Sequence, residues 1–257
     1  MSSPADYYKS LPPVSKALGT LCFFATLAVQ LGLLDVFYIY MDYSKAIYNL
    51  QIWRFLTNFL FLGKFSINFG IRLLMIARYG VQLEQGPFQG RTADFLWMML
   101  FSMFTMLTVG LIIPPLRLPF MGPSLVFMLL YVWSREFANS RVNIMGLFTV
   151  QGFYLPWVML MLNVIFGSAL LTDLMGIVVG HVYYFLTVLH PRSGGRNLLR
   201  TPLWVHRIAS RIPNIGAGVG GAGAGGPVVG GAGAGAPRPA QPANRGTAFT
   251  GRSYRLQ

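Results

Sequence analysis

Long apolar stretches joined by short polar connections dominate the chain up to His190. A helix needs about 20 mostly apolar residues to cross the hydrocarbon core of a bilayer. Uncharged windows predict five such helices, at residues 17–34, 95–113, 118–134, 154–171 and 174–190. Pro114 and Pro115 end one window just before another begins, which predicts a helical hairpin. Asp173 separates the last two windows and is expected at a span boundary.

Residues 55–83 are less apolar, because Lys64, Arg72 and Arg78 interrupt them. At about 100° per residue, a helix here would carry a mainly polar stripe, turned inward or toward water. The stripe consists of Asn68, Arg72, Met75, Tyr79 and Gln82. We place the second span at residues 65–83 and a long first loop at residues 35–64. The fold expected is an all-α membrane protein with six transmembrane helices, and five or seven spans remain open.

The composition favours a membrane protein over a soluble domain. Of the 257 residues, 54% are hydrophobic and 11% are charged, whereas soluble domains carry about 25% charged residues. Cys22 is the single cysteine, so one chain cannot build a disulfide framework or a cysteine-based zinc site. We predict no metal and no other cofactor.

The basic residues predict the topology. The formal charge is +13, and nine of the 20 Lys and Arg residues follow His190. Six spans put both termini on one side, where most of the Lys and Arg residues then lie, so the positive-inside rule places both termini in the cytosol. Nucleic acid is not expected as a partner, because the arginines of the tail are diluted among Gly and Pro with few aromatic residues to stack on bases.

The chain divides into four predicted parts. Residues 1–16 form a cytosolic segment, and residues 17–190 form the membrane domain. In the basic segment 191–213, Thr201 as N-cap and Pro202 as first helical residue predict a short helix to Ile212 on the membrane surface, with a partly ordered linker as alternative. The apolar side of this helix would be Trp204, Val205, Ile208 and Ile212. Residues 214–257 form a disordered Gly-rich tether.

Two short motifs lie in or beside the predicted spans. Gly176 and Gly180 form a GxxxG pattern, which lets another helix approach closely in lipid. We expect that helix to come from the same chain, with contact between chains as the alternative. Trp53-Arg54 in the first loop suits the bilayer interface, with the indole at headgroup depth and the guanidinium snorkelling or bonding loop carbonyls.

Several motifs, taken in their order, resemble the derlin family, the rhomboid-like pseudoproteases of endoplasmic-reticulum quality control. They are Trp53-Arg54, Gly90-Arg91-Thr92-Ala93-Asp94, Tyr131-Val132-Trp133, Gly176-x-x-x-Gly180-His181 and Gly194-Gly195-Arg196-Asn197. The resemblance implies a rhomboid-like bundle in the endoplasmic-reticulum membrane that helps misfolded lumenal or membrane proteins reach ubiquitin-dependent degradation. It also implies a membrane ubiquitin ligase complex as a partner, and it leaves homo- or hetero-oligomers open.

A rhomboid protease needs a serine at the start of the fourth span and a histidine in the sixth. Aligned on the motif of the fourth span, the rhomboid serine falls on Gly122, so Ser124 is displaced by two residues. The rhomboid histidine falls on Asp173, and His181 lies more than two helical turns further on. The resemblance therefore implies no catalytic residues, and we expect His181 to be a hydrogen-bonded core residue.

The extreme C-terminus is similar to the F-x-G-x-x-x-x-L peptide by which derlins dock on a cytosolic AAA unfoldase, valosin-containing protein. Phe249 and Leu256 would be its apolar anchors, and Gly251 would allow a tight turn. Arg252 and Arg255 would favour an acidic groove. Ser253 departs from the pattern, because a second glycine is common there.

The mechanism expected is a distortion of the bilayer. Arg72 in a weakly apolar span, together with the first loop, would admit water and headgroups and thin the membrane for a crossing chain. In the alternative interpretation, Arg72 pairs with an internal carboxylate or carbonyl and only fixes the fold. An intramembrane serine protease and a small-solute channel or transporter are the alternative functions.

Overall fold

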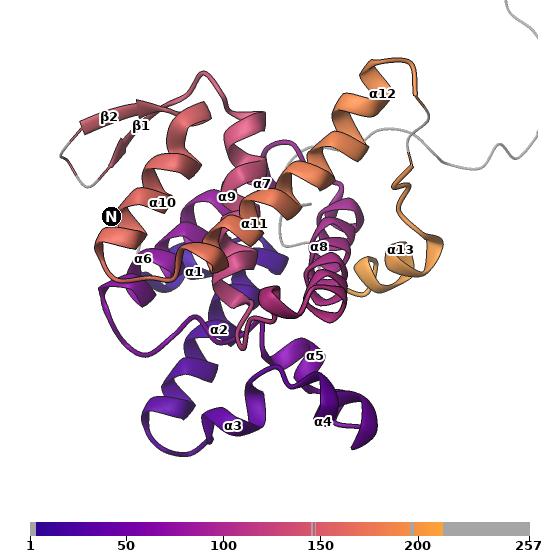
Figure 1. Cartoon of the computed structure of the whole chain (residues 1–257). Helices are drawn as coiled ribbons and strands as arrows, with labels where there is room; N and C mark the ends of the chain where they lie inside the picture. Colours follow the sequence, from indigo (N-terminus) through magenta and orange to yellow (C-terminus); the bar gives the residue numbers. More distant parts are fainter. Residues whose placement is uncertain (1–3, 145, 147, 196–197, 213–257) are drawn as a thin grey trace, which may run out of the picture. The chain divides into compact units, whose positions relative to one another are not determined.

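The described part of the chain is mostly helical (Figure 1). The computed structural model describes residues 4–144, 146, 148–195 and 198–212, so the predicted tether lies outside it. One antiparallel hairpin, β1 (Arg141–Ile144) and β2 (Phe148–Gln151), pairs Arg141 with Gln151. The helices and helical turns are α1 (Pro4–Ser10), α2 (Pro13–Gln30), α3 (Val36–Ile39), α4 (Tyr43–Tyr48), α5 (Arg54–Thr57), α6 (Ile67–Met75), η1 (Ile76–Gly80), α7 (Val81–Gln85), α8 (Thr92–Ile112), η2 (Pro114–Leu116), α9 (Gly122–Glu136), η3 (Gly152–Tyr154), α10 (Leu155–Ile165), α11 (Leu170–Tyr184), η4 (Phe185–Leu189), α12 (His190–Arg192) and α13 (Leu203–Ala209).

Three helical stretches among the described residues are long and apolar enough to cross a membrane. They are Pro13–Gln30, Thr92–Ile112 and Leu170–Arg192. The predicted second span coincides with α6, η1 and α7, which follow one another without a break and contain one wider π-helical turn. α9 and α10 have 15 and 11 residues and fall short of a full span. Six spans therefore remain a prediction, with a helical segment at each expected place.

Two boundaries differ from the sequence prediction. α2 begins at Pro13, inside the predicted N-terminal segment. α10 ends at Ile165 rather than near Leu171, because Gly167 takes a positive φ of 81° that an α-helix cannot continue through. Asp173 then lies within the first turns of α11, fully buried, and not in a connection between spans.

α9 forms the centre of the core. Residues 122–134 are all buried, which leaves this helix almost no contact with solvent or lipid. α11 packs along it through the two glycines of the GxxxG motif (Figure 1). A Cβ added at Gly176 would overlap the Ser124 carbonyl oxygen, and one added at Gly180 would lie 3.0 Å from Cβ of Tyr131. The GxxxG motif therefore serves packing within the chain in this structure.

A carboxylate distant in sequence caps the first long helix. Glu84, in α7, accepts hydrogen bonds from the backbone N–H groups of Val14 (2.9 Å) and Ser15 (2.7 Å) and from the Ser15 hydroxyl. These N–H groups belong to the first turn of α2, where backbone N–H groups have no acceptor within the helix. A negative charge is also favourable at the positive end of the helix dipole. Glu84 thereby fixes α2 to the helix α6–η1–α7.

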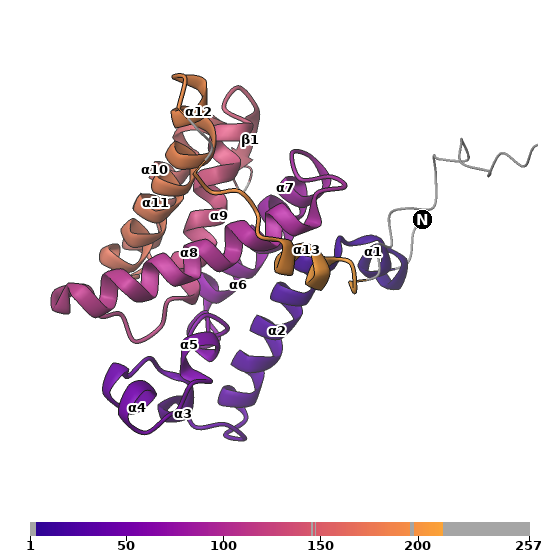
Figure 2. The same cartoon turned by 90° about the vertical axis from the view of Figure 1, so that its right-hand side faces the viewer.

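The predicted first loop contains three short helices, α3, α4 and α5. Asp35 and Asp42 cap α3 and α4, because their side chains accept hydrogen bonds from backbone N–H groups of these helices. The hydrogen bond from the Tyr40 hydroxyl lowers the pKa of Asp42. Figures 1 and 2 place α3–α5 at one end of the helical body, and the hairpin β1–β2 and α12 at the opposite end.

Replacing Gly176 with leucine should destabilise the protein, because the added side chain would meet the α9 backbone. We expect a loss of at least about 1–3 kcal/mol, as for overpacked cores. The measurement is the thermal unfolding midpoint of the purified chain in detergent. Gly70→Ala is the matched control, because an added Cβ at Gly70 in α6 meets no atom within 4 Å. Equal midpoints for Gly176→Leu and the native chain would contradict the packing described.

Candidate functional site

The polar stripe of the predicted second span is directed mainly at the protein. Arg72, Met75 and Tyr79 are buried, Asn68 is half-buried and Gln82 is exposed. Tyr79 is buried, with its ring centroid 4.7 Å from that of Trp133 in α9. Gln82 accepts a 2.7 Å hydrogen bond from the indole N–H of the same tryptophan. Asn68 donates to the backbone oxygen of Phe166, just after α10. The stripe thus ties α6–η1–α7 to α9 and α10.

Arg72 and Asp173 form the charged centre of the site. Arg72 donates to the Leu62 carbonyl (2.8 Å) and to the Ser168 hydroxyl (3.1 Å). Its Nη2 lies 3.9 Å from Oδ1 of Asp173, at the long end of ion-pair geometry. Asp173 accepts a 2.9 Å hydrogen bond from Asn163 on Oδ2. We call Asn68, Arg72, Asn163, Ser168 and Asp173 the polar cluster.

The polar cluster lies beside a hollow of about 330 Å³. The hollow is lined by three connections that meet at one end of the bundle: the loop before α6, the loop before α9 and the loop between α10 and α11. Lys64 and Arg72 contribute positive charge to its wall. A helical bundle interior with an ion pair and an adjoining hollow is a place where water can enter the membrane domain.

Arg54 organises the first loop, while Trp53 faces outward. The Arg54 side chain is only 3% exposed and donates to Oε1 of Gln51 and to the carbonyls of Phe37 and Tyr40. Of the two roles predicted for this guanidinium, the structure shows the bonding of loop carbonyls. Trp53 is 48% exposed. Further large apolar side chains are exposed on the same loop: Phe37, Tyr38, Tyr48, Leu50, Ile52 and Leu56.

The rhomboid-like serine and histidine positions hold other interactions. A Cβ added at Gly122 would lie 2.6 Å and 2.7 Å from the carbonyl oxygens of Phe61 and Phe59, so this position has no room for a side chain. The hydroxyl of Ser124 is buried and donates to the Thr172 carbonyl (2.6 Å). His181 shares a 2.7 Å hydrogen bond between Nδ1 and the Tyr131 hydroxyl, but it is exposed, so its assignment to the core was wrong.

The juxtamembrane helix also differs from its prediction. α13 runs from Leu203 to Ala209, and Pro202 occupies the N-cap position without a side-chain cap. Thr201 donates its hydroxyl to Asp94 instead. Val205 is fully buried against α8, so the side predicted to lie on the membrane is partly used for packing on the protein.

Other predicted residues divide into described and undescribed ones. Arg91 forms an ion pair with Asp94 within the motif at the start of α8. Gly194 has a positive φ of 89°, and Gly195 lies against the ring of His190. The tail residues of the docking peptide, Phe249, Gly251, Arg252, Arg255 and Leu256, lie outside the described residues.

Sequence reasoning missed Asn163, Ser168 and the buried position of Asp173. Polar residues in otherwise apolar spans were a signal for Asn163 and Asp173, because such residues usually face a partner inside the bundle. The partner itself could not be identified, since residues 72 and 173 are about a hundred positions apart and no helical periodicity relates them.

Comparison with known proteins gives consistent matches along the chain. The model of the Der1-like family matches residues 11–203. The chain is 58% identical over 266 residues to Derlin-1 of Arabidopsis thaliana, covering 100% of this chain and 99% of the relative. It is 56% identical over 257 residues to Derlin-1 of Oryza sativa subsp. japonica, with coverage of 100% and 99%. Derlin-2 of the same species is 35% identical over 231 residues, with coverage of 84% and 92%.

A double-mutant cycle should show that Arg72 and Asp173 are energetically coupled. Arg72→Leu and Asp173→Leu each leave one buried charge without its partner, which costs about 3–5 kcal/mol. The double variant removes both charges and should recover most of that loss. The measurement is the free energy of unfolding of the four proteins in detergent. Additive losses in the double variant would show that the two residues do not interact.

Proposed function

The chain belongs to the Der1-like, or derlin, family, and on that premise we propose that it is a non-catalytic component of endoplasmic-reticulum-associated degradation. In this proposal it binds misfolded proteins and assists their passage to the cytosol. It does so by thinning the bilayer and by recruiting an AAA unfoldase through its tail. The chain acts as a multi-pass protein of the endoplasmic-reticulum membrane with both termini in the cytosol.

The observation that carries this proposal is a short, lipid-facing helix that ends at the polar cluster. η3 and α10 have 3 and 11 residues, and together they span roughly 21 Å. The hydrocarbon core of a bilayer is about 30 Å thick. Trp157, Met161 and Ile165 are 44%, 67% and 74% exposed, so one side of α10 faces outward, toward lipid in a membrane. A bilayer adapts to such a helix by becoming thinner around it.

Polar side chains of the cluster meet the chain at the end of α10. Asn68 contacts Phe166 directly after the helix, and Ser168 contacts Arg72. A bilayer of full thickness would cover this end with hydrocarbon, where polar groups are costly. Thinning exposes it to water and headgroups instead. A polar polypeptide that crosses beside α10 would then meet a shorter and wetter barrier.

The first loop supports the same distortion. Arg54 holds the loop together from inside, and the exposed apolar side chains around Trp53 can enter the membrane interface. The opposite end of the body carries the hairpin and α12, which agrees with a topology that puts the first loop in the lumen (Figure 2). α12 and α13 contain Arg192 and Arg207, and basic residues are expected on the cytosolic side.

The lack of a protease function is supported by the geometry around α9. Gly122 is enclosed by two carbonyl oxygens, and Asp173 is engaged by Asn163 and Arg72. The hydroxyl of Ser124 already donates to the Thr172 carbonyl. Among the described residues, no hydrogen bond joins it to a side chain that could act as a base. A nucleophilic serine requires a base that can accept its proton. We therefore propose a rhomboid-like pseudoprotease.

Removing the intramembrane charges should slow export of a misfolded protein. In cells without their own derlins, Arg72→Leu combined with Asp173→Leu should lengthen the half-life of a misfolded lumenal glycoprotein about twofold or more, because polar groups no longer attract water and headgroups into the membrane. Thr108→Val is the matched control, since its hydroxyl bonds only within α8 in the described structure. An unchanged half-life, with the double variant present at normal abundance, would exclude the proposed mechanism.

The proposed tail contact can be tested separately. Truncation after Ala248 removes the predicted docking peptide and leaves the described structure intact. The intact chain should retain the AAA unfoldase in a pull-down from detergent extract, and the truncated chain should retain at least about tenfold less if the peptide supplies the apolar anchors. Phe249→Ala with Leu256→Ala in the full chain is the point-variant control. Equal recovery by the intact and truncated chains would remove the tail from the proposal.

A further inference from the structure

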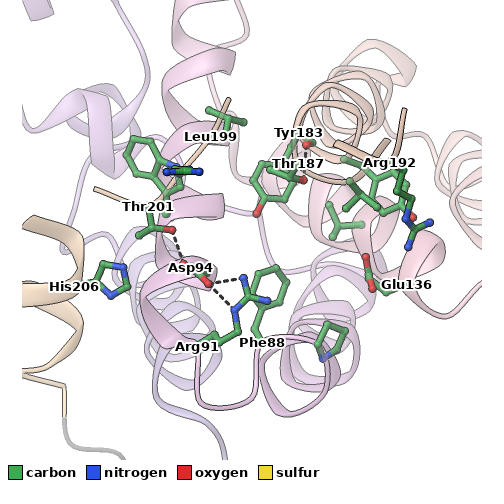
Figure 3. Close-up of a pocket in the computed structure, with 16 residues that line it drawn as sticks. Phe88, Arg91, Asp94, Glu136, Tyr183, Thr187, Arg192, Leu199, Thr201 and His206 are labelled. Carbon is green, nitrogen blue, oxygen red and sulfur yellow. Dashed lines mark hydrogen bonds and ion pairs between the residues drawn. The ribbon is translucent and has the colours of Figure 1, made fainter. Parts of the chain in front are cut away.

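The segment after the last long helix folds back onto α8. Thr201 donates its hydroxyl to Oδ1 of Asp94, in the first turn of α8. Nε and Nη2 of Arg91 both lie 2.6 Å from the other carboxylate oxygen of Asp94 (Figure 3). The carboxylate therefore has one oxygen for Arg91 and one for Thr201. We call residues 198–212 the latch.

A small apolar contact completes the latch. Val205 is fully buried and Ala209 is 8% exposed, and both pack on α8 at Ala93 with Leu96 and Trp97 beside them. The Trp204 ring meets the Trp97 ring edge-on, with 6.1 Å between centroids. Leu199 packs against the main core as well, and the Thr201 hydrogen bond adds a polar contact that joins the latch to α8.

Thr201 has the features of a phosphoryl acceptor. It is half-buried and precedes Pro202, which has an extended backbone with φ −65° and ψ 150°. Of the 16 prolines of the sequence, only Pro4 and Pro202 follow a serine or a threonine. Thr201 borders a cavity of about 730 Å³ with Glu136 and Arg192 on its far wall (Figure 3). The latch follows α12, which lies at the end of the body that we assign to the cytosol, where ATP is present (Figure 2).

We propose that Thr201 is a regulatory phosphorylation site for a proline-directed kinase, and that the phosphate releases the latch. The inference rests on the proposed cytosolic placement of the C-terminus. In the reaction the γ-phosphoryl group of ATP moves to Oγ1 of Thr201. The O–H bond breaks, a P–O bond forms, ADP leaves and the proton passes to solvent. The hydroxyl becomes accessible when the latch opens transiently.

Phosphorylation reverses the interaction with Asp94. The phosphoester oxygen has no proton to donate, and the phosphate brings a charge of about −1.5 to −2 next to a carboxylate. Arg91 already neutralises that carboxylate through two nitrogen atoms. Arg200 and His206 also border the cavity, but Arg200 is exposed and can follow the released segment into solvent. The electrostatic balance at Asp94 thus changes from attraction to repulsion.

Release would change the attachment of the tail. With the latch closed, the proposed tether is attached to the body through α13. With the latch open, it starts near Arg192, at the end of α12. The tether is then longer, and a docked unfoldase has a wider range of positions. A longer tether also lowers the effective concentration of the tail near the membrane.

A cysteine at the buried latch position can report on opening. Val205→Cys places a thiol where the side chain is fully buried, and the native Cys22 is buried as well. In the full chain in lipid nanodiscs, the rate of maleimide labelling at position 205 measures how often α13 detaches. The protein is treated with a purified proline-directed kinase and ATP, and mass spectrometry locates the phosphate.

We expect phosphate on Thr201 and labelling about tenfold faster than in the untreated protein, as for the loss of a hydrogen bond to a charged group. Thr201→Glu should also accelerate labelling. Ser210→Glu is the matched control, because it adds the same charge to the latch at an exposed position whose hydroxyl donates to the Arg207 carbonyl within α13. That control should change the rate less than about twofold, as for an exposed charge without a fixed partner.

Two outcomes would overturn the proposal. One is an absence of phosphate on Thr201 under conditions in which the kinase fully modifies a peptide of residues 198–206. The other is phosphate on Thr201 with an unchanged or slower labelling rate, which would mean that Arg91 or Arg200 accepts the phosphate and keeps the latch closed. Neither outcome depends on export, so the proposed function and this inference fail independently.

Discussion

A charge placed among apolar helices must find its partners inside the chain, and this constraint organises the membrane domain. Arg72 of α6 meets it with the Leu62 carbonyl, the Ser168 hydroxyl and the carboxylate of Asp173. These partners come from the loop before α6, the loop after α10 and the first turns of α11. One guanidinium thus joins four separate segments, because unpaired charges are costly where water is scarce.

Close packing of backbones gives the second organising contact. α9 is buried on every side, and α11 can approach it only because residues 176 and 180 lack side chains. In lipid there is little hydrophobic gain when helices associate, so such contacts depend on van der Waals packing and hydrogen bonds. The same approach brings Asp173 within reach of Asn163 and the Ser124 hydroxyl within reach of Thr172. Packing and polar pairing therefore support each other.

The two ends of the bundle have different chemistry. At one end, two features favour a distorted bilayer: the exposed apolar side chains of the first loop and the termination of α10 at Ile165, short of a full span. From the other end, α12 leads into the segment that the Asp94 carboxylate, paired with Arg91, holds through Thr201. A protein that moves chains across a membrane needs both features: a weakened barrier and an attachment point for a motor. In the proposed function these features stand at the lumenal and cytosolic ends.

The sequence by itself determined the helical class, the approximate places of the long helices and the family. Hydropathy predicts the helices because a helix in lipid satisfies its backbone polar groups within its own segment. One run of apolar residues is therefore enough to identify it. The sequence also placed Asn68, Tyr79 and Gln82 on one polar stripe, since helical periodicity is local too, and left open whether the stripe faces inward or toward water. Only the tertiary structure decided that Arg72 faces Asp173, that Glu84 caps α2, that His181 is exposed and that Thr201 bonds to Asp94. Each of these features depends on how segments distant in the sequence pack against one another, which no pattern within one segment contains.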